Sequence, residues 1–217
     1  MIDLPSPVVM MVLGVAVGLL PFLLLLSTSF LKVAIVLALL RNAIGVQQIP
    51  PPMALNGLAM ILTMFIMLPV GIDTMDILDK QTFPERLTGV IVVEAAINSS
   101  GPLKEFLKRH TDTAVSGVLE QTAKRIWPSR YQELARPDNW VVLILGFALS
   151  EISRAFELGF LLYLPFICID LVVSNILLAM GMMMVSPMTI SLPFKLLLFV
   201  YLDGWVKVFQ GLMLSYR

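Results

Sequence analysis

The chain has little of the chemistry that enzymes and metal proteins use. Its 217 residues include one cysteine, Cys168, and one histidine, His110. A lone cysteine excludes an intrachain disulfide and a cysteine-based metal site, and its apolar surroundings predict a small buried side chain. His110 stands beside Lys108 and Arg109 and is expected to be a solvated helix residue. Nucleotide-binding, zinc-protease and serine-hydrolase motifs are absent, so we expect no enzyme, metal or cofactor.

Charged residues are also scarce. They make up 14% of the chain, while 58% is hydrophobic and the mean hydropathy is +0.90. An ordinary soluble domain is about 45–50% apolar and about 25% charged. The chain is therefore predicted to be a membrane protein. Its formal net charge of zero favours no nucleic-acid partner.

Several apolar runs flank a polar middle. Val8 to Ser27 is about 20 residues long, enough to cross a hydrocarbon core of about 30 Å. It is too long for a cleaved signal, so we expect the first helix to be retained. Trp140 to Met184, with Pro165 near its middle, is interpreted as a helical hairpin or a bent pair of helices. The other apolar runs are Phe30 to Leu40, Ala54 to Val70, and Leu192 to Tyr216, the last expected to be one final helix.

These patterns predict an all-α protein with about four hydrophobic spans. Residues 1–73 are expected to form N-terminal hydrophobic helices, and residues 140–217 C-terminal hydrophobic helices with a methionine-rich loop. Residues 74–139 are predicted to be a polar, extracytoplasmic segment with helices over Pro102 to His110 and Val118 to Ile126. Arg41, between the first two apolar blocks, favours this orientation.

Charges inside the apolar runs need an explanation, because each costs about 2.5–3.5 kcal/mol at a bilayer centre. Arg154 is three residues from Glu151 and from Glu157, so one helix face could hold an ion-pair ladder. A proton or ion relay and contacts with partner subunits are the alternatives. Lys32, Lys195 and Asp203 have no evident local partner and suggest contacts with other helices or subunits. The whole set is Lys32, Glu151, Arg154, Glu157, Asp170, Lys195 and Asp203.

Five of the 14 methionines lie within nine positions: Met180, Met182, Met183, Met184 and Met188. Gly181 and the Ser186-Pro187 pair predict a loop or a helix end there. Methionine is unbranched and adaptable. The cluster could therefore be core packing or simple membrane apolarity, or it could be a deformable seal, since dewetted apolar constrictions are known to gate pores.

Three blocks of the chain resemble the FliP/YscR/SctR family of type III protein export machines. They are TSFLKVAIVLALLRNAIGVQQIPP (Thr28 to Pro51), FALSEISRAFELGFLLYLPFICIDLVVSNILLAMGMMMVSP (Phe147 to Pro187) and PFKLLLFVYLDGW (Pro193 to Trp205). With the order of elements, the resemblance covers nearly the whole chain. The connector GVQQIPP looks like the virulence injectisome branch more than the flagellar branch.

This resemblance implies a fold and an assembly that hydropathy would miss. Family members form bent helical hairpins that assemble into a helical oligomeric pore, a pentamer, largely on the periplasmic side of the bacterial inner membrane. The implied partners are SctS-type and SctT-type proteins, SctU-type and SctV-type components, and transiently unfolded secreted proteins. The family's methionine gasket corresponds to Met180, Met182, Met183 and Met184.

The sequence thus favours a non-catalytic, pore-forming subunit of the type III secretion export gate, which passes unfolded effector and needle proteins. One alternative is an ion or small-solute transporter that uses Glu151, Arg154 and Asp170 as a relay. Another is a structural scaffold for other channel proteins. Sealing that depends on the methionines would separate the gate from the scaffold.

Overall fold

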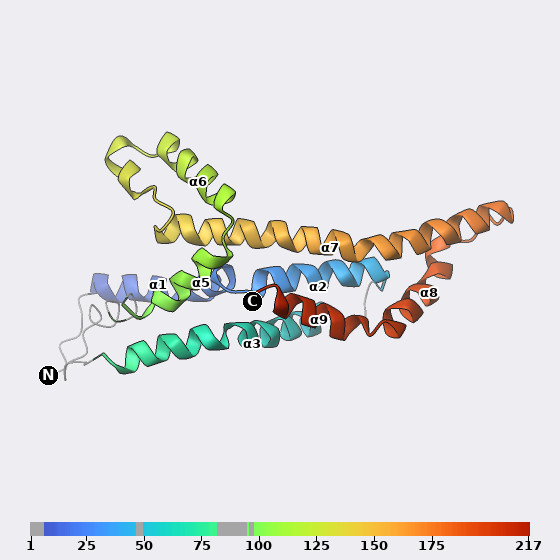
Figure 1. Ribbon diagram of the computed structural model, residues 1–217, viewed down its shortest axis with the longest axis horizontal. Helices are drawn as coiled ribbons and strands as arrows, with labels where there is room; N and C mark the ends of the chain where they lie inside the picture. Colours follow the sequence, from blue (N-terminus) through green and yellow to red (C-terminus); the bar gives the residue numbers. More distant parts are fainter. Residues whose placement is uncertain (1–6, 47–49, 82–94, 96–97) are drawn as a thin grey trace. The chain divides into compact units, whose positions relative to one another are not determined.

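A computed structural model describes residues 7–46, 50–81, 95 and 98–217 of the chain. This part of the chain contains helices, turns and connecting segments and no strands, so the predicted all-α class is confirmed (Figure 1). In chain order the elements are α1 (Pro7–Ser27), α2 (Phe30–Ile44), α3 (Pro52–Asp79), α5 (Gly101–His110), α6 (Thr113–Ile126), the 3-10 helix η1 (Ser129–Leu134), α7 (Trp140–Ala179), α8 (Pro187–Tyr201) and α9 (Gly204–Leu214).

Two compact units make up the chain, and each combines segments that are distant in sequence. The first unit contains Met1–Ser29 and Met67–Glu151, and the second contains Phe30–Ile66 and Ile152–Arg217. Helices α3 and α7 each contribute to both units. Helix α3 continues past Asp73, where the composition becomes polar, to Asp79. The division into residues 1–73, 74–139 and 140–217 stays a prediction.

The core of the second unit is built on one face of α2. Val33, Val36, Leu37 and Leu40 recur every three or four residues and are at most 1% exposed. This spacing places them on the same side of a helix. Gly45, with φ of +87°, ends α2 in a conformation that glycine adopts without a steric penalty. Other core residues, from α3, α7, α8 and α9, are Leu55, Ala59, Ala155, Phe166, Phe199, Val208 and Leu212.

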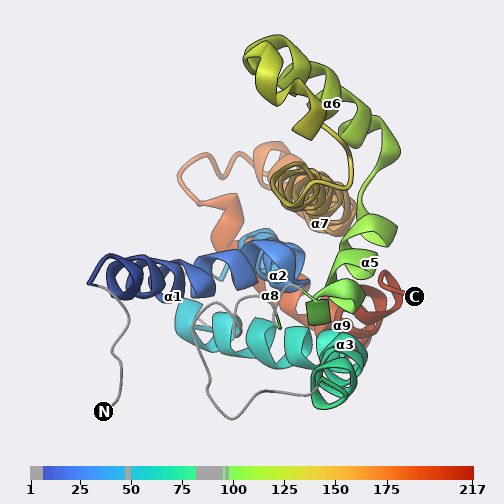
Figure 2. The same cartoon turned by 90° about the vertical axis from the view of Figure 1, so that its left-hand side faces the viewer.

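The first unit packs α5 and α6 with the opening turns of α7. The Asp112 side chain caps α6 by accepting a hydrogen bond from the Ala114 N–H at 2.8 Å. The Asp112 N–H in turn donates to Ser150 Oγ of α7 at 2.9 Å. Figure 2 shows η1 turning back beside α6, with which it is in contact. Both helices predicted in the polar segment are confirmed, although α6 begins earlier, at Thr113.

His110 is buried, so its predicted solvation was wrong. It is 7% exposed, its ring centroid lies 4.5 Å from that of Phe106, and its Nδ1 lies 2.8 Å from the Phe106 carbonyl oxygen. Residues four apart share one face of a helix, and this face of α5 also carries buried Leu107. The neighbouring charges had suggested a solvated position, but helical periodicity places His110 with the apolar residues.

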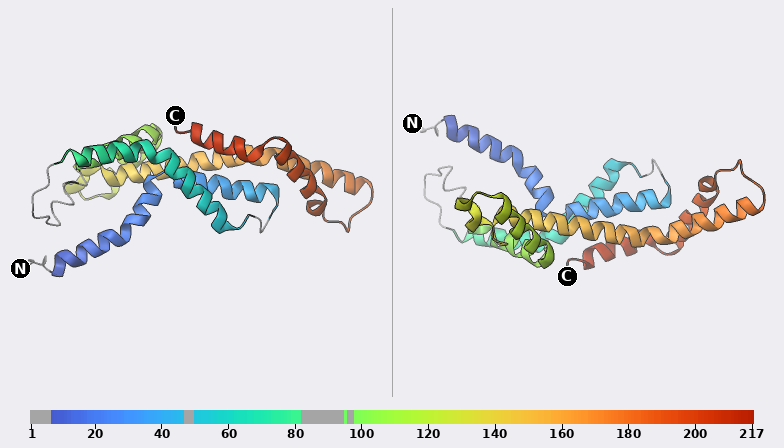
Figure 3. Two further views of the ribbon diagram at one scale, coloured as in Figure 1. Left: turned by 90° about the horizontal axis from the view of Figure 1, so that it is seen from below. Right: turned by 90° about the horizontal axis from the view of Figure 1, so that it is seen from above.

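Helix α7 is one continuous helix of 40 residues, so the predicted hairpin or helix pair over Trp140 to Met184 was wrong. Pro165 lies inside this helix, and Figure 3 shows α7 as one unbroken ribbon. Proline removes one backbone donor and crowds the preceding turn, which bends or breaks a helix. Here Leu164 and Phe166 flank it, and no glycine or other turn residue adjoins it. Nothing local therefore favours a reversal of the chain.

The final apolar run forms two helices, so the single helix predicted over Leu192 to Tyr216 was also wrong. Helices α8 and α9 meet at a 60° bend. At the break Asp203 has φ of +52°, a left-handed conformation that aspartate tolerates better than most residues. Gly204 follows, and the Phe199 ring occupies the space that a Cβ on Gly204 would need. Pro187, which ends the preceding apolar run, is also the first residue of α8.

Helices α3 and α7 are long and apolar enough to cross a membrane. Two interrupted pairs also pass this test when each is taken together: Val17–Ser27 with Phe30–Ile44, and Pro187–Tyr201 with Gly204–Leu214. The described residues therefore offer between two and four candidate spans by length and composition. This range includes the four hydrophobic spans predicted from the sequence.

Candidate functional site

The methionine loop, residues 180–186, joins α7 to α8 in the second unit. Its first turn is built by two backbone hydrogen bonds: the Gly181 N–H donates to the Leu178 carbonyl at 3.0 Å, and the Met182 N–H to the Leu177 carbonyl at 2.9 Å. With Gly181 at φ of +73°, this is the Schellman ending of a helix. The end of α7 therefore satisfies its own carbonyls before the methionines begin.

The methionine side chains of this loop are exposed to solvent in the single chain. Met184 is 99% exposed and Met183 is 83% exposed, and Met180 and Met182 are 66% and 40% exposed. Met188, on the first turn of α8, is also exposed. Apolar side chains held at a loop tip gain nothing from the fold of their own chain. Exposed apolar side chains that lie next to one another are typical of surfaces that meet a protein partner or a membrane.

Two of the charged residues predicted from the apolar runs lie side by side on the two helices that flank this loop. Lys195 Nζ of α8 lies 2.6 Å from Asp170 Oδ2 of α7, and the Lys195 side chain is 3% exposed against 38% for Asp170. Asp170 Oδ1 also accepts a hydrogen bond of 2.5 Å from Ser191 Oγ. One carboxylate thus receives a charged donor and a hydroxyl donor, both from α8.

Lys195 also contacts the end of α2. Its Nζ donates to the Ala43 carbonyl oxygen at 3.3 Å. Ala43 lies in the last turn of α2, whose final carbonyls have no partner within the helix and carry the negative end of its dipole. The ammonium therefore connects α2, α7 and α8 within one unit.

Lys32, in the first turn of α2, is fully buried. Its ammonium lies 3.6 Å from the centroid of the Tyr216 ring, next to the C-terminal residue. A cation over an aromatic face is stabilised by the ring's quadrupole, and more strongly where water is excluded. This contact joins α2 to the segment after α9.

The remaining charges of the set lie in three different environments. Glu151 is fully buried, and Arg154 is partly buried one turn further along α7. Glu157 is exposed on the same helix, and Asp203 is exposed at the break between α8 and α9. The interhelix or intersubunit role of these charges stays a prediction.

Sequence reasoning missed Ser191 and Tyr216. Ser191 is fully buried and lies four residues before Lys195, so both side chains share one face of α8. That spacing was a readable signal for a polar pair. Tyr216 offered no comparable signal, since its proximity to Lys32 depends on how α9 folds back beside α2.

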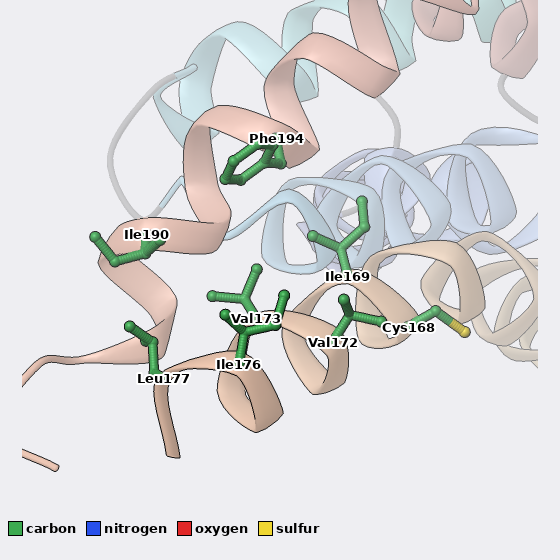
Figure 4. A pocket seen from close by; sticks show the side chains of 8 residues that line it. All are labelled: Cys168, Ile169, Val172, Val173, Ile176, Leu177, Ile190 and Phe194. Carbon is green, nitrogen blue, oxygen red and sulfur yellow. The ribbon is translucent and has the colours of Figure 1, made fainter. Parts of the chain in front are cut away.

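An apolar groove of about 490 Å³ lies between α7 and α8. Most of it lies between Asp170 and the methionine loop. Figure 4 shows its lining side chains on both helices. Cys168 stands at one end and is exposed, so its predicted burial was wrong; the two helices do not close over it. The groove is lined by Cys168, Ile169, Val172, Val173, Ile176, Leu177, Ile190 and Phe194.

Metal chemistry has no evident place in the described part of the chain. No group of three or more histidine, cysteine, aspartate or glutamate side chains converges there. The polar centre at Lys195 has an ammonium, one carboxylate, a hydroxyl and a carbonyl. These contacts join α2, α7 and α8.

Comparison with known proteins relates almost the whole chain to one family. Residues 11–212 match the FliP family. The chain is 50% identical over 217 residues to the Yop proteins translocation protein R of Yersinia pestis, covering 100% of this chain and 99% of that protein. It is 43% identical over 209 residues to the hypersensitivity response secretion protein HrcR of Ralstonia nicotianae, covering 96% of each.

A third relative is the virulence protein YscR of Salmonella typhimurium, 41% identical over 213 residues and covering 97% of each chain. These similarities run the full length of the proteins and are not confined to one motif. The resemblance predicted from three sequence blocks is confirmed. The chain belongs to the FliP family, the helical, non-enzymatic membrane proteins of the type III secretion export apparatus.

Proposed function

We propose that this chain is a pore-forming subunit of the export gate through which unfolded effector and needle proteins cross the bacterial inner membrane. Membership of the FliP family and relatives named for translocation and secretion support this function. The methionine loop seals the closed channel. It parts around a passing chain of any sequence because methionine side chains are flexible and apolar.

The exposed methionine loop is the observation that carries the proposal. Met183 and Met184 are 83% and 99% exposed at the tip of a helical hairpin. A ring of such loops, one from each subunit, places apolar side chains around one axis. An apolar constriction blocks ions by excluding water, and flexible side chains keep it closed without a fixed shape.

A homo-oligomer, a pentamer by family resemblance, provides that ring. The exposed apolar side chains of α3 support burial against neighbouring subunits or lipid, since soluble monomers rarely expose such continuous patches. These include Met60, Met64, Phe65 and Leu68. SctS-type and SctT-type proteins complete the gate, SctU-type and SctV-type components adjoin it, and the assembled complex lies largely on the periplasmic side.

Assembly is tested by native mass spectrometry of the detergent-extracted protein, expressed alone and with its SctS-type and SctT-type partners. The expected result is a closed homo-oligomer that adds both partners. A stable monomer or dimer that ignores both partners would contradict the proposal.

The seal is tested with the purified complex in liposomes. Replacing Met182, Met183 and Met184 together by glycine removes the apolar side chains and is expected to make the resting complex conduct ions. Replacing the same three residues by leucine is the matched control, because leucine keeps the apolar volume and should preserve the seal. A glycine variant that assembles and still blocks ions would contradict the sealing role of the methionines and favour a structural scaffold for other channel proteins.

A transporter is the competing outcome, and buried Glu151 is the observation that favours testing it. Proton flux through the chain reconstituted without partners, abolished by Glu151→Gln, would move the transporter ahead of the gate. The gate proposal expects no such flux from the chain alone.

A further inference from the structure

The hairpin that carries the methionine loop is tied at its base by one polar cluster. We name it the loop clamp: Asp170 of α7, Ser191 and Lys195 of α8, and the Ala43 carbonyl of α2. Ser191 and Lys195 are 0% and 2% exposed, so both donors are shielded from water, whereas the Asp170 carboxylate that accepts from them is 38% exposed. In the described part of the hairpin, Asp170 receives both of the side-chain hydrogen bonds that join α7 to α8.

Beyond the clamp the two helices are held less firmly. The apolar groove of about 490 Å³ separates them there, and its lining includes Val173 and Ile176 on one side and Ile190 on the other (Figure 4). Close packing would leave few voids larger than a water molecule. Past the clamp the side chains thus leave space between the two helices, although Val173 and Leu177 on α7 are only 9% and 8% exposed.

The loop lies at the end of a lever. Helix α7 continues from Asp170 to Ala179, and nine further residues at a rise of 1.5 Å extend it by about 14 Å. A small rotation at the clamp moves Met183 and Met184 much further than it moves Asp170. Contacts at the clamp thus have a large effect on where the methionines lie.

We propose that the loop clamp positions the methionine loop, so that Asp170, Ser191 and Lys195 set the resting seal without touching the exported chain. The proposal rests on the sealing function above. Hydrogen bonds at the clamp fix the angle between α7 and α8 by direction, which apolar contacts of equal volume do not do. Loss of these bonds widens the range of loop positions and opens leaks in the closed ring.

The test measures ion leak through the resting complex in liposomes. Asp170→Asn removes the charge, and Ser191→Ala removes one hydrogen bond while leaving the ion pair. We expect both variants to assemble by native mass spectrometry and to leak more than the wild type, Asp170→Asn by the larger factor. Lys207→Met is the control, because it removes an exposed lysine of the same unit and should not raise the leak.

A second readout separates positioning from a merely structural role. Spin labels at Met184→Cys and Gln210→Cys, in a Cys168→Ala background, report the distance from the loop to α9 in the folded protein. Positioning predicts a broader distance distribution in Ser191→Ala. A distribution as narrow as that of the wild type would overturn the proposal even if the variant unfolds at lower temperature.

Comparison with the variant in which Met182, Met183 and Met184 are all glycine distinguishes a failure of the clamp proposal from a failure of the proposed sealing function. If that variant leaks and the clamp variants seal, the clamp proposal is wrong and the export function stands. If the triple glycine variant also seals, the sealing function is wrong, and the clamp proposal falls with it.

Discussion

Lys195 and Asp170 form a partly buried ion pair, although they lie 25 positions apart in sequence with the whole methionine loop between them. Their side-chain atoms lie 2.6 Å apart, and the two partners differ in burial, at 3% exposed for the lysine and 38% for the aspartate. Asp170 keeps Ser191 as a donor when the lysine is removed. Lys195 keeps only the Ala43 carbonyl among its described partners when the aspartate is removed.

This asymmetry predicts different costs for the two single substitutions. Asp170→Leu leaves the buried Lys195 ammonium without its carboxylate partner and should lower the free energy of unfolding by about 3–5 kcal/mol. Lys195→Met leaves a carboxylate that reaches water and should cost clearly less. Thermal unfolding of the detergent-solubilised complex measures both.

The double variant Asp170→Leu with Lys195→Met is the control, since neither charge remains to be buried. It is expected to unfold closer to the wild type than Asp170→Leu does. Equal losses from the two single variants, added together in the double, would show that the pair is not coupled.

Lys32 and Tyr216 give a second prediction. Tyr216→Phe keeps the ring face over which the ammonium lies and should lose little of the cation–π contact. Tyr216→Leu removes the face and should lower the free energy of unfolding by a further amount, about 0.5–2 kcal/mol. Thermal unfolding of the two variants compares them directly. Equal stability would show that the ring face contributes nothing.

The sequence predicts features that depend on neighbouring residues better than contacts between residues that are distant in the chain. Apolar runs predicted most helices because their length and composition are local properties. The methionine loop was predicted for the same reason, since Gly181 and Pro187 interrupt the helix where it occurs. The pairing of Asp170 with Lys195 could not be read from spacing, because it depends on the angle at which α8 returns beside α7.

Errors in the helix predictions have identifiable causes. Pro165 was weighed as a breaker, but its apolar neighbours support a continuous helix. Asp203 and Gly204 were interpreted as part of a helix, although the pair allows a left-handed residue beside a residue without a Cβ. The first outcome follows from the residues beside Pro165, whereas the second also depends on the Phe199 ring that packs where a Cβ on Gly204 would lie.

Ser150 gives a third prediction, in the first unit. Its hydroxyl accepts from the Asp112 N–H and donates to the Gly146 carbonyl, and it is 2% exposed. Ser150→Ala removes the acceptor and should lower the free energy of unfolding by about 0.5–1.5 kcal/mol. Hydrogen exchange at the Asp112 amide should speed up as well.

Thr122→Ala is the matched control for Ser150→Ala. Thr122 also donates to a carbonyl one turn back, that of Val118, but it is exposed on α6. Water replaces that hydrogen bond, so the expected change lies within about 0.5 kcal/mol. A loss at Thr122 as large as that at Ser150 would contradict the role assigned to the Asp112 contact.

Two glycines of α9 give a final prediction with opposite signs. A Cβ on Gly204 would overlap the Phe199 ring, which is 7% exposed and lies edge-on to Trp205 at a centroid distance of 5.3 Å. Gly204→Ala must therefore displace a packed ring and should cost about 1–3 kcal/mol.

A Cβ on Gly211 meets nothing within 4 Å. Gly211→Ala should instead stabilise the helix by up to about 1 kcal/mol, because alanine is the better helix former. Thermal unfolding midpoints that move in opposite directions support this packing, whereas a Gly204→Ala variant as stable as the wild type would show that the Phe199 ring yields to the added Cβ.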